Sequence, residues 1–241
     1  MSLVPLPETL PPFLGPYLPT ASESLPFVTL TWAQSLDGRI AAAKGVQTKI
    51  SHQETKAMTH YLRSKHDAIL VGIGTVLADD PKLNCRIPNA ASPRPIIIDP
   101  NGKWNYAKST LRSLVESGHG RSPYIIIGEN VKPCEEDISI LSAQNGKHIA
   151  LPLSDNISAN WHLILQAMTA EKIKSVMIEG GGKIINDLLL LPQFINSIII
   201  TIGPVFLGQN GVEVSPFQQV QLENVKWWIG VQDSILAATL G

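Results

Sequence analysis

Three successive glycines follow Glu179, and they form the stretch of the sequence best suited to hold an anionic ligand. The apolar residues 175–178 are typical of a strand, and the residues after Gly182 are typical of a helix. Glycines at such a junction let backbone N–H groups approach a ligand, and the beginning of a helix carries partial positive charge. This combination favours a pyrophosphate, with Lys183 as an additional positive charge. A tight turn without a ligand is the alternative, and the glycines alone do not decide between the two.

Glu179 itself is a candidate for contact with a substrate. It ends an apolar strand, and ligands bind to open α/β sheets at the carboxyl ends of the strands. A carboxylate at that edge needs a partner, and an amine or hydroxyl group of a substrate is one.

A second candidate segment runs from Gly72 to Arg86. Two glycines, Gly72 and Gly74, suggest a dinucleotide-binding loop of the Rossmann type, but the third glycine of that motif is replaced by Leu77. The alternative is a short turn in which Thr75 and Asp79, four residues apart, lie on one face and bind ribose hydroxyls or a nicotinamide amide. A capped turn without a ligand remains open too, because Asp before Pro is common in turns.

Two arginines are candidates for holding a phosphate. Arg63 and Arg86 carry the planar guanidinium that suits a phosphate if both converge on it, whereas a solvated surface position is the alternative for each. No catalytic acid or base can be assigned from residue type. His60 and His66 are candidates in principle, and we interpret both as residues on the surface of a helix.

The elements expected to position these residues alternate between strands and helices. Runs such as 96–98 and 198–200 are continuous isoleucine, which favours strands buried on both faces. The predicted strands are 27–33, 68–72, 95–99, 124–127, 148–151, 175–178, 197–202, 227–231 and 234–239. The predicted helices are 51–65, opened by a capping box from Ser51 to Glu54, then 159–172, and one from the glycine turn to before Pro192. We predict an α/β fold for residues 27–241: one domain of three layers, with a mostly parallel mixed sheet flanked by helices.

Residues 1–26 contain seven prolines, a density that predicts an extended arm without regular structure. The whole chain has 241 residues, 44% hydrophobic and 16% charged, with a formal net charge of −1. This balance provides no field to attract nucleic acid or an anionic membrane. Cys85 and Cys134 belong to no metal-binding pattern, so no metal site is expected. Without a signal peptide or a membrane span in the sequence, we expect a cytoplasmic protein.

Four motifs in fixed order resemble those of the riboflavin-biosynthesis reductases, a family with a dihydrofolate-reductase-like fold. The motifs are Ser-Leu-Asp-Gly-Arg at 35–39, Gly-Thr-Val-Leu-Ala-Asp-Asp-Pro at 74–81 with Leu83, Arg-Pro-Ile-Ile-Ile-Asp at 94–99, and Glu-Gly-Gly at 179–181. The resemblance covers about residues 27–240.

The resemblance implies a homodimer that uses NADPH to reduce the ribosylamino side chain of a ribosylaminopyrimidine phosphate to ribitylamino. Residues implied to contact the cofactor are Thr75, Asp79, Asp99, Gly180, Gly181, Gly182, Lys183, Ile184, Ile185, Asn186 and Asp187. Residues implied to contact the substrate are Asp37, Arg63, Leu83, Arg86 and Glu179. Many relatives have Ser or Thr after the residue that matches Asp99, whereas this chain has Pro100.

Two other functions remain open. One is a reductase of the same fold that acts on dihydrofolate or another pteridine, and the other is a non-catalytic nucleotide-binding protein. A Rossmann dehydrogenase is disfavoured by Leu77.

Overall fold

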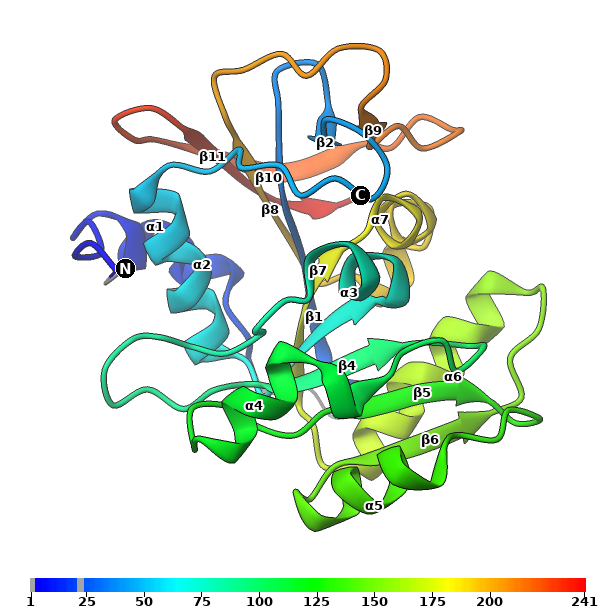
Figure 1. Ribbon diagram of the computed structural model, residues 1–241. Helices are drawn as coiled ribbons and strands as arrows, with labels where there is room; N and C mark the ends of the chain where they lie inside the picture. Colours follow the sequence, from blue (N-terminus) through cyan, green and yellow to red (C-terminus); the bar gives the residue numbers. More distant parts are fainter. Residues whose placement is uncertain (1–2, 21–23) are drawn as a thin grey trace.

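A nine-stranded sheet runs through the protein in a computed structural model that describes residues 3–20 and 24–241 (Figure 1). The strand order is β10-β11-β8-β1-β7-β3-β4-β5-β6; the pairs β10–β11 and β11–β8 are antiparallel, and all other neighbours in this sheet are parallel. The strands are β1 (Phe27–Gln34), β3 (Ala68–Gly72), β4 (Arg94–Ile98), β5 (Tyr124–Gly128), β6 (Lys147–Leu151), β7 (Ser175–Gly180), β8 (Ser197–Ile202), β10 (Leu222–Ile229) and β11 (Ser234–Leu240). The expected mostly parallel, mixed α/β sheet is confirmed, and every predicted strand is present.

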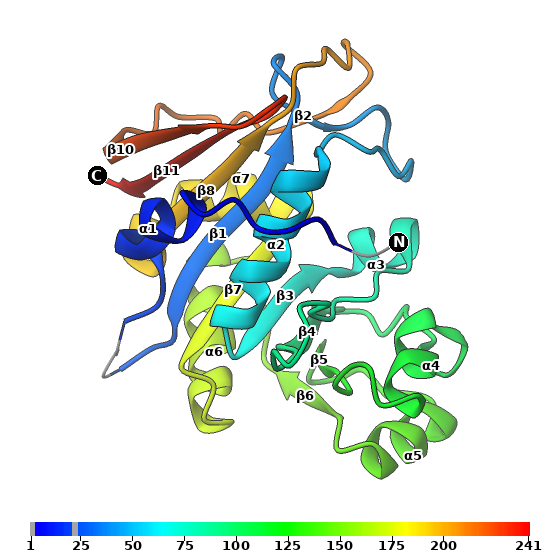
Figure 2. The ribbon, with the colours of Figure 1, turned by 90° about the vertical axis from the view of Figure 1, so that its left-hand side faces the viewer.

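Helices cover both faces of this sheet (Figure 2). They are α1 (Leu10–Leu14), α2 (Gln53–Lys65), α3 (Ile73–Asp79), α4 (Thr110–Glu116), α5 (Glu135–Ala143), α6 (Ile157–Ala170) and α7 (Gly182–Leu189). Helices α6 and α7 pack on one face together with Ile96, whereas α3, α4 and α5 pack on the other face together with Ile97. Neighbouring residues of β4 thus enter different cores, which explains the continuous isoleucine run. No helix of residues 3–20 and 24–241 combines the length and the hydropathy needed to traverse a lipid bilayer.

Several short elements were not expected from the sequence. Strands β2 (Arg39–Ala41) and β9 (Val212–Glu213) form a separate antiparallel pair between two loops. Helices α4 and α5 are only seven and nine residues long. The turn expected around Thr75 and Asp79 is the helix α3. Elements this short carry too few residues for a hydrophobic period to stand out.

Helix α2 begins differently from the predicted capping box. Its N-cap is His52, and no side chain of the cap bonds to the first turn. The turn between β10 and β11 supplies the capping interactions instead. Asp233 Oδ2 accepts hydrogen bonds from the His52 backbone N–H at 2.7 Å and from the Thr55 hydroxyl at 2.5 Å. Glu54 accepts from the Val231 N–H at 2.9 Å, so the Glu of the expected box is engaged with another part of the chain.

The proline-rich arm is not irregular over its whole length, and that expectation is wrong for residues 10–17. Pro11 and Pro12 lie in the first turn of α1, where the missing N–H of proline costs nothing. A 3-10 turn, Gly15–Tyr17, follows directly. Leu10 and Leu14 are fully buried in a core shared with α2, β8 and β11. Arm residues 1–2 and 21–23 lie outside the described residues.

Candidate functional site

The glycine bend (residues 180–182) and the beginning of α3 lie in contact at the carboxyl ends of β7 and β3. These two strands are parallel neighbours, with Val71 opposite Gly180. A Cβ added to Gly181 would lie 3.2 Å from Thr75 Oγ1, and one added to Gly72 would lie 2.8 Å from Ile184 Cδ1. The two segments that the sequence marked as ligand-binding therefore form one corner of the molecule.

The backbone at this corner requires glycine. Gly180 has φ of +96° and Gly181 has φ of +68° with ψ of +148°, a combination that residues with a Cβ essentially never adopt. Gly181 is the N-cap of α7, so the first backbone N–H groups of that helix lack intrahelical acceptors. Across the corner, burial raises the pKa of Asp79 on α3 above its usual value.

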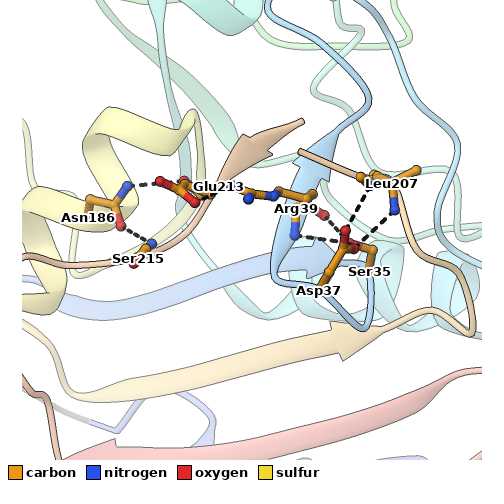
Figure 3. A network of polar contacts seen from close by, with 8 residues as sticks. Ser35, Asp37, Arg39, Asn186, Leu207, Glu213 and Ser215 are labelled. Atoms are coloured by element: carbon orange, nitrogen blue, oxygen red, sulfur yellow. Dashed lines mark hydrogen bonds and ion pairs between the residues drawn. The ribbon is translucent and has the colours of Figure 1, made fainter. Parts of the chain in front are cut away.

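The side chains of α7 are mostly engaged within the protein. Ile185 is fully buried, and Lys183 Nζ forms an ion pair with Asp187 Oδ2 at 2.8 Å. Asn186 donates to the backbone oxygen of Glu213 at 3.2 Å and accepts from the Ser215 N–H at 2.8 Å (Figure 3). This part of the chain can therefore bind a ligand chiefly through its backbone N–H groups.

Asp37 holds a neighbouring loop. Its carboxylate accepts hydrogen bonds from the Ser35 hydroxyl at 2.5 Å, from the Leu207 N–H at 3.0 Å and from the Gly208 N–H at 2.8 Å (Figure 3). The Ser35 hydroxyl and the two backbone N–H groups lower the pKa of Asp37 to about 2. The carboxylate thus remains ionised at neutral pH and fixes residues 203–211 to the end of β1. An ion pair between Arg39 and Glu213 joins β2 to β9 beside it.

Arg63 and Glu179 bind each other. Arg63 donates from Nε to Glu179 Oε1 at 2.9 Å and from Nη2 to Oε2 at 2.7 Å, a two-pronged contact. Its Nη1 donates to the backbone oxygen of Asn84 at 3.0 Å. We expected Arg63 to hold a phosphate together with Arg86, whereas in the structure its guanidinium pairs directly with the Glu179 carboxylate.

Arg86 is held by His60. Arg86 Nε donates to His60 Nε2 at 3.0 Å, and the Arg86 backbone nitrogen lies 3.2 Å from His60 Nδ1. The imidazole also forms a hydrogen bond with the backbone of Asn84. Burial, together with the positive charges of Arg63, Arg86 and Lys56, lowers the pKa of His60 to about 3. His60 is consequently a neutral group at physiological pH.

His60 in α2 and His66 directly after α2 are both buried, so the interpretation of these two residues as helix-surface residues is wrong. His60 is 4% exposed and His66 is 6% exposed. His66 Nδ1 lies 2.7 Å from the backbone oxygen of Leu62, and Nε2 lies 2.8 Å from Thr29 Oγ1. Burial lowers the pKa of His66 to about 4. The tertiary packing of α2 on the sheet hides side chains that the sequence alone left at the surface.

An open groove of about 510 Å³ lies beside Arg86. We call it the Arg86 groove, and its lining residues are Asn84, Cys85, Arg86, Ile87, Ala90, Ser92, Gly118, His119, Gly120 and Arg121. Two of the lining residues, Arg86 and Arg121, are arginines, which gives the groove a positive character. Leu83, which precedes Asn84 in the sequence, is buried in the core with Val76 and Ile97, and its φ is +50°. Asn84 and Arg121 were not singled out from the sequence. They line the same groove only because two loops that are distant in the sequence meet there.

Asp99 directly follows β4 and is almost fully buried. Its Oδ2 accepts from the Trp104 N–H at 2.8 Å, which closes the loop after the strand. Its Oδ1 is buried and has no partner within residues 3–20 and 24–241. The residue lines a pocket of about 180 Å³ together with Asp137 and His148. In the described part of the chain, no three His, Cys, Asp or Glu side chains gather as metal ligands.

The sequence was compared with known families and proteins. Residues 26–235 match the family described as the RibD C-terminal domain. A 2,5-diamino-6-ribosylamino-4(3H)-pyrimidinone 5′-phosphate reductase from Debaryomyces hansenii is 58% identical, with 100% of both chains covered. The reductase of the same name from Saccharomyces cerevisiae is 47% identical over 100% of this chain and 99% of the relative.

Solved structures support the same relationship. The riboflavin biosynthesis reductase of Saccharomyces cerevisiae matches with a TM-score of 0.83 and 43% identity, over 97% of this chain and 100% of that chain. These matches confirm the resemblance to the riboflavin-biosynthesis reductases. A family match over most of the chain and relatives of equal length leave one assignment: this chain belongs to the RibD C-terminal domain family.

Proposed function

We propose that this protein is the NADPH-dependent reductase that converts the ribosylamino side chain of 2,5-diamino-6-ribosylamino-4(3H)-pyrimidinone 5′-phosphate to ribitylamino. The relative from Debaryomyces hansenii carries the name of this reductase and is 58% identical over its whole length. The observation that carries the proposal is the contact between Gly181 and Thr75, because it joins two expected dinucleotide-binding segments in one corner.

The glycine bend fits a dinucleotide. A Cβ at Gly181 would fill the space beside Thr75, so glycine leaves room there for a ligand. We assign the pyrophosphate to the backbone N–H groups from Gly180 through Gly182 and Lys183 to the first turn of α7. Ile184, Ile185, Asn186 and Asp187 support this turn by packing, by hydrogen bonds and by the Lys183 ion pair.

Further cofactor contacts come from the neighbouring strands. Thr75 and Asp79 offer a hydroxyl and a carboxylate on one face of α3, for ribose hydroxyls or the nicotinamide amide. Asp99 lies directly after β4, the neighbour of β3, and one of its buried carboxylate oxygens has no hydrogen-bond partner among residues 3–20 and 24–241, which suits a hydroxyl donor. When bound, the nicotinamide dinucleotide supplies the hydride for the reduction.

The substrate is assigned to the region between Glu179 and Arg86. Glu179, fixed by Arg63, orients the amino or hydroxyl groups of the opened sugar and the pyrimidine. Arg86 binds the 5′-phosphate, and Leu83 shapes the loop that carries Arg86. Asp37 acts at the border of the site by holding residues 203–211 in place.

Substrate-dependent oxidation of NADPH tests the function. We expect rapid loss of NADPH absorbance when the pyrimidine phosphate is added and none with dihydrofolate. Equal turnover of dihydrofolate would favour a pteridine reductase, and NADPH binding without turnover would favour a non-catalytic protein. The same assay with NADH measures the preference between the two dinucleotides.

Glu179→Gln is expected to lower turnover while leaving NADPH affinity unchanged. The amide keeps the shape of Glu179 but loses the charge that pairs with Arg63. Loss of a charged hydrogen-bonded contact of this kind should lower turnover about 10- to 100-fold. Steady-state kinetics and NADPH titration measure both quantities. Glu171→Gln is the matched control. Glu171 forms an ion pair with Lys147, with 2.7 Å between Oε2 and Nζ, and this pair does not belong to the proposed site. Full activity of Glu179→Gln would remove Glu179 from the substrate site.

A homodimer is part of the proposal, and the edge strand β10 supports it. Val225, Trp227, Ile229 and Val231 alternate along and just beyond this strand and are all exposed, Ile229 at 72%. A row of apolar side chains on an edge strand favours pairing with a second chain. Light scattering should therefore give about twice the chain mass of 26.2 kDa. Trp227→Glu combined with Ile229→Glu should yield monomers, and a monomeric native protein at micromolar concentration would contradict the dimer.

The domain division is also proposed here. Residues 27–241 form the reductase domain, and residues 1–26 form an arm that packs on it through α1.

A further inference from the structure

We propose that Arg121 is a second arginine of the phosphate site, and that the loop formed by residues 118–121 helps to hold the 5′-phosphate of the substrate in the Arg86 groove. The inference rests on the proposed function, in which Arg86 binds this phosphate. Arg121 takes the role that was expected of Arg63, because the Arg63 guanidinium is paired with Glu179.

The side chains that line the Arg86 groove favour an anion. Among the described residues that line it, Arg86, His119 and Arg121 have basic side chains and none has a carboxylate. The groove volume of about 510 Å³ lies within the range of about 300–1,000 Å³ that is typical of small-molecule sites. A guanidinium presents several N–H donors in one plane, and this arrangement matches the oxygens of a phosphate. An anionic group in the groove would therefore meet both positive charge and hydrogen-bond donors.

The charge of Arg121 is not compensated by an ion pair with a carboxylate of residues 3–20 and 24–241. One of its neighbours is another arginine: burial, and next the positive charge of Arg121, lower the pKa of Arg94. Two neighbouring guanidinium groups repel each other, and a bound anion offsets this repulsion. A phosphate in the groove would thus gain the attraction of Arg121 without displacing a carboxylate from it, whereas at Arg63 it would have to compete with Glu179.

A defined turn at the end of α4 places residues 118–121 at the groove. Gly118 has φ of +74° and donates its N–H to the Val115 oxygen at 3.0 Å, and the His119 N–H donates to the Leu114 oxygen at 3.0 Å. These two hydrogen bonds form a Schellman motif, which ends a helix and turns the chain. Because backbone groups and a glycine form this turn, removal of the Arg121 side chain should leave the loop in place.

Asn84 connects this loop to the proposed position of the sugar. Its Nδ2 donates to the His119 oxygen at 3.0 Å, and its backbone oxygen accepts from Arg63 Nη1 at 3.0 Å. Arg63 in turn binds the carboxylate of Glu179. A series of direct contacts thus leads from Glu179, which is proposed to orient the opened sugar, to the groove. The lining of the groove includes no residue of the glycine bend or of α3, which favours the phosphate of the substrate over the 2′-phosphate of NADPH.

Replacing Arg121 with alanine should raise KM for the pyrimidine phosphate about 10-fold, as for a lost hydrogen bond to a charged group. Turnover at saturating substrate and KM for NADPH should stay unchanged. The dephosphorylated pyrimidine nucleoside should be reduced equally well by the native protein and by Arg121→Ala, because it lacks the group that Arg121 binds. Arg121→Lys keeps the charge and should recover part of the affinity.

Arg112→Ala is the matched control. Arg112 lies on α4, the helix that leads into the loop, and its Nε pairs with Glu116 Oε1 at 2.8 Å, but it does not line the groove. Its replacement removes a positive charge from the same part of the molecule, and KM for the pyrimidine phosphate should not change.

Binding of ribose 5-phosphate, measured by calorimetry, gives a readout without turnover. We expect its Kd to rise in Arg121→Ala and to stay unchanged in Arg112→Ala. An unchanged Kd in Arg121→Ala, or equal losses with the phosphorylated and the dephosphorylated substrate, would overturn the inference. A rise in KM for NADPH but not for NADH would also overturn it, since the groove would then hold the phosphate of the cofactor.

Arg86→Ala separates the failure of the inference from the failure of the proposed function. If the pyrimidine phosphate is reduced and its KM rises in Arg86→Ala but not in Arg121→Ala, the function stands and the role of Arg121 is wrong. If the pyrimidine phosphate is not reduced, the proposed function fails. Binding of ribose 5-phosphate that depends on Arg121 would still identify the groove as a phosphate site.

Discussion

Replacing Gly181 with valine is expected to weaken NADPH binding at least about 100-fold, which corresponds to about 2.7 kcal/mol. Gly181 has φ of +68° and ψ of +148°, where a side chain costs about 1–3 kcal/mol. Its added Cβ would also lie 3.2 Å from Thr75 Oγ1, so the larger side chain would occupy the corner assigned to the pyrophosphate. Titration of NADPH fluorescence measures the Kd directly.

A second glycine with positive φ serves as the control for this substitution. Gly45 has φ of +77°, and a Cβ added there meets no atom within 4 Å. Gly45→Val also places a side chain at positive φ but does not fill the corner, so NADPH affinity should match that of the native protein. If Gly181→Val binds NADPH normally while remaining folded, the dinucleotide does not lie at the glycine bend.

Replacing Leu14 with alanine is expected to lower the free energy of unfolding by about 2–5 kcal/mol. Leu14 is 0% exposed and packs in a core with Leu62, Ile199 and Ile235. The truncation removes three buried carbons and leaves a cavity between α1, α2 and the sheet. Urea unfolding followed by circular dichroism measures the loss.

Leu77→Ala provides the matched comparison for Leu14. Leu77 also lies in a short helix, α3, but it is 59% exposed. Its truncation should cost less than about 1 kcal/mol. A comparably small loss for Leu14→Ala would mean that the arm contributes little to the fold and only rests on the domain.

The strands, and the meeting of the glycine bend with α3, could be predicted because their signals are local. In β4 and β8, runs of isoleucine report burial on both faces, and the structure gives each run two cores. The glycine bend and Thr75 were recognisable because each follows directly after an apolar strand. Parallel pairing then brings the ends of neighbouring strands to one edge of the sheet, which joins the two segments.

The partners of individual polar side chains could not be predicted, because they come from distant parts of the chain. Glu54 has the spacing of a capping box, yet it binds Val231 across 177 positions. Arg63, on α2, was a candidate phosphate ligand, whereas its guanidinium pairs with Glu179 of β7. His60 offered no local sign of burial, since only the loop that returns from α3 brings Arg86 against it. Sequence spacing describes neighbours along the chain, and these contacts depend on the topology.

The packing of α1 also has a consequence for how the chain acquires its structure during synthesis. Leu10 and Leu14 share their core with Ile235 and Ala237, Thr9 accepts a hydrogen bond from Trp228 Nε1 at 3.0 Å, and Tyr17 donates to the backbone oxygen of Asn224. Trp228 lies 219 positions after Thr9, and Asn224 lies 207 positions after Tyr17. Contacts between residues so far apart in the sequence form slowly, so we expect this core to close completely only after β10 and β11 have been synthesised.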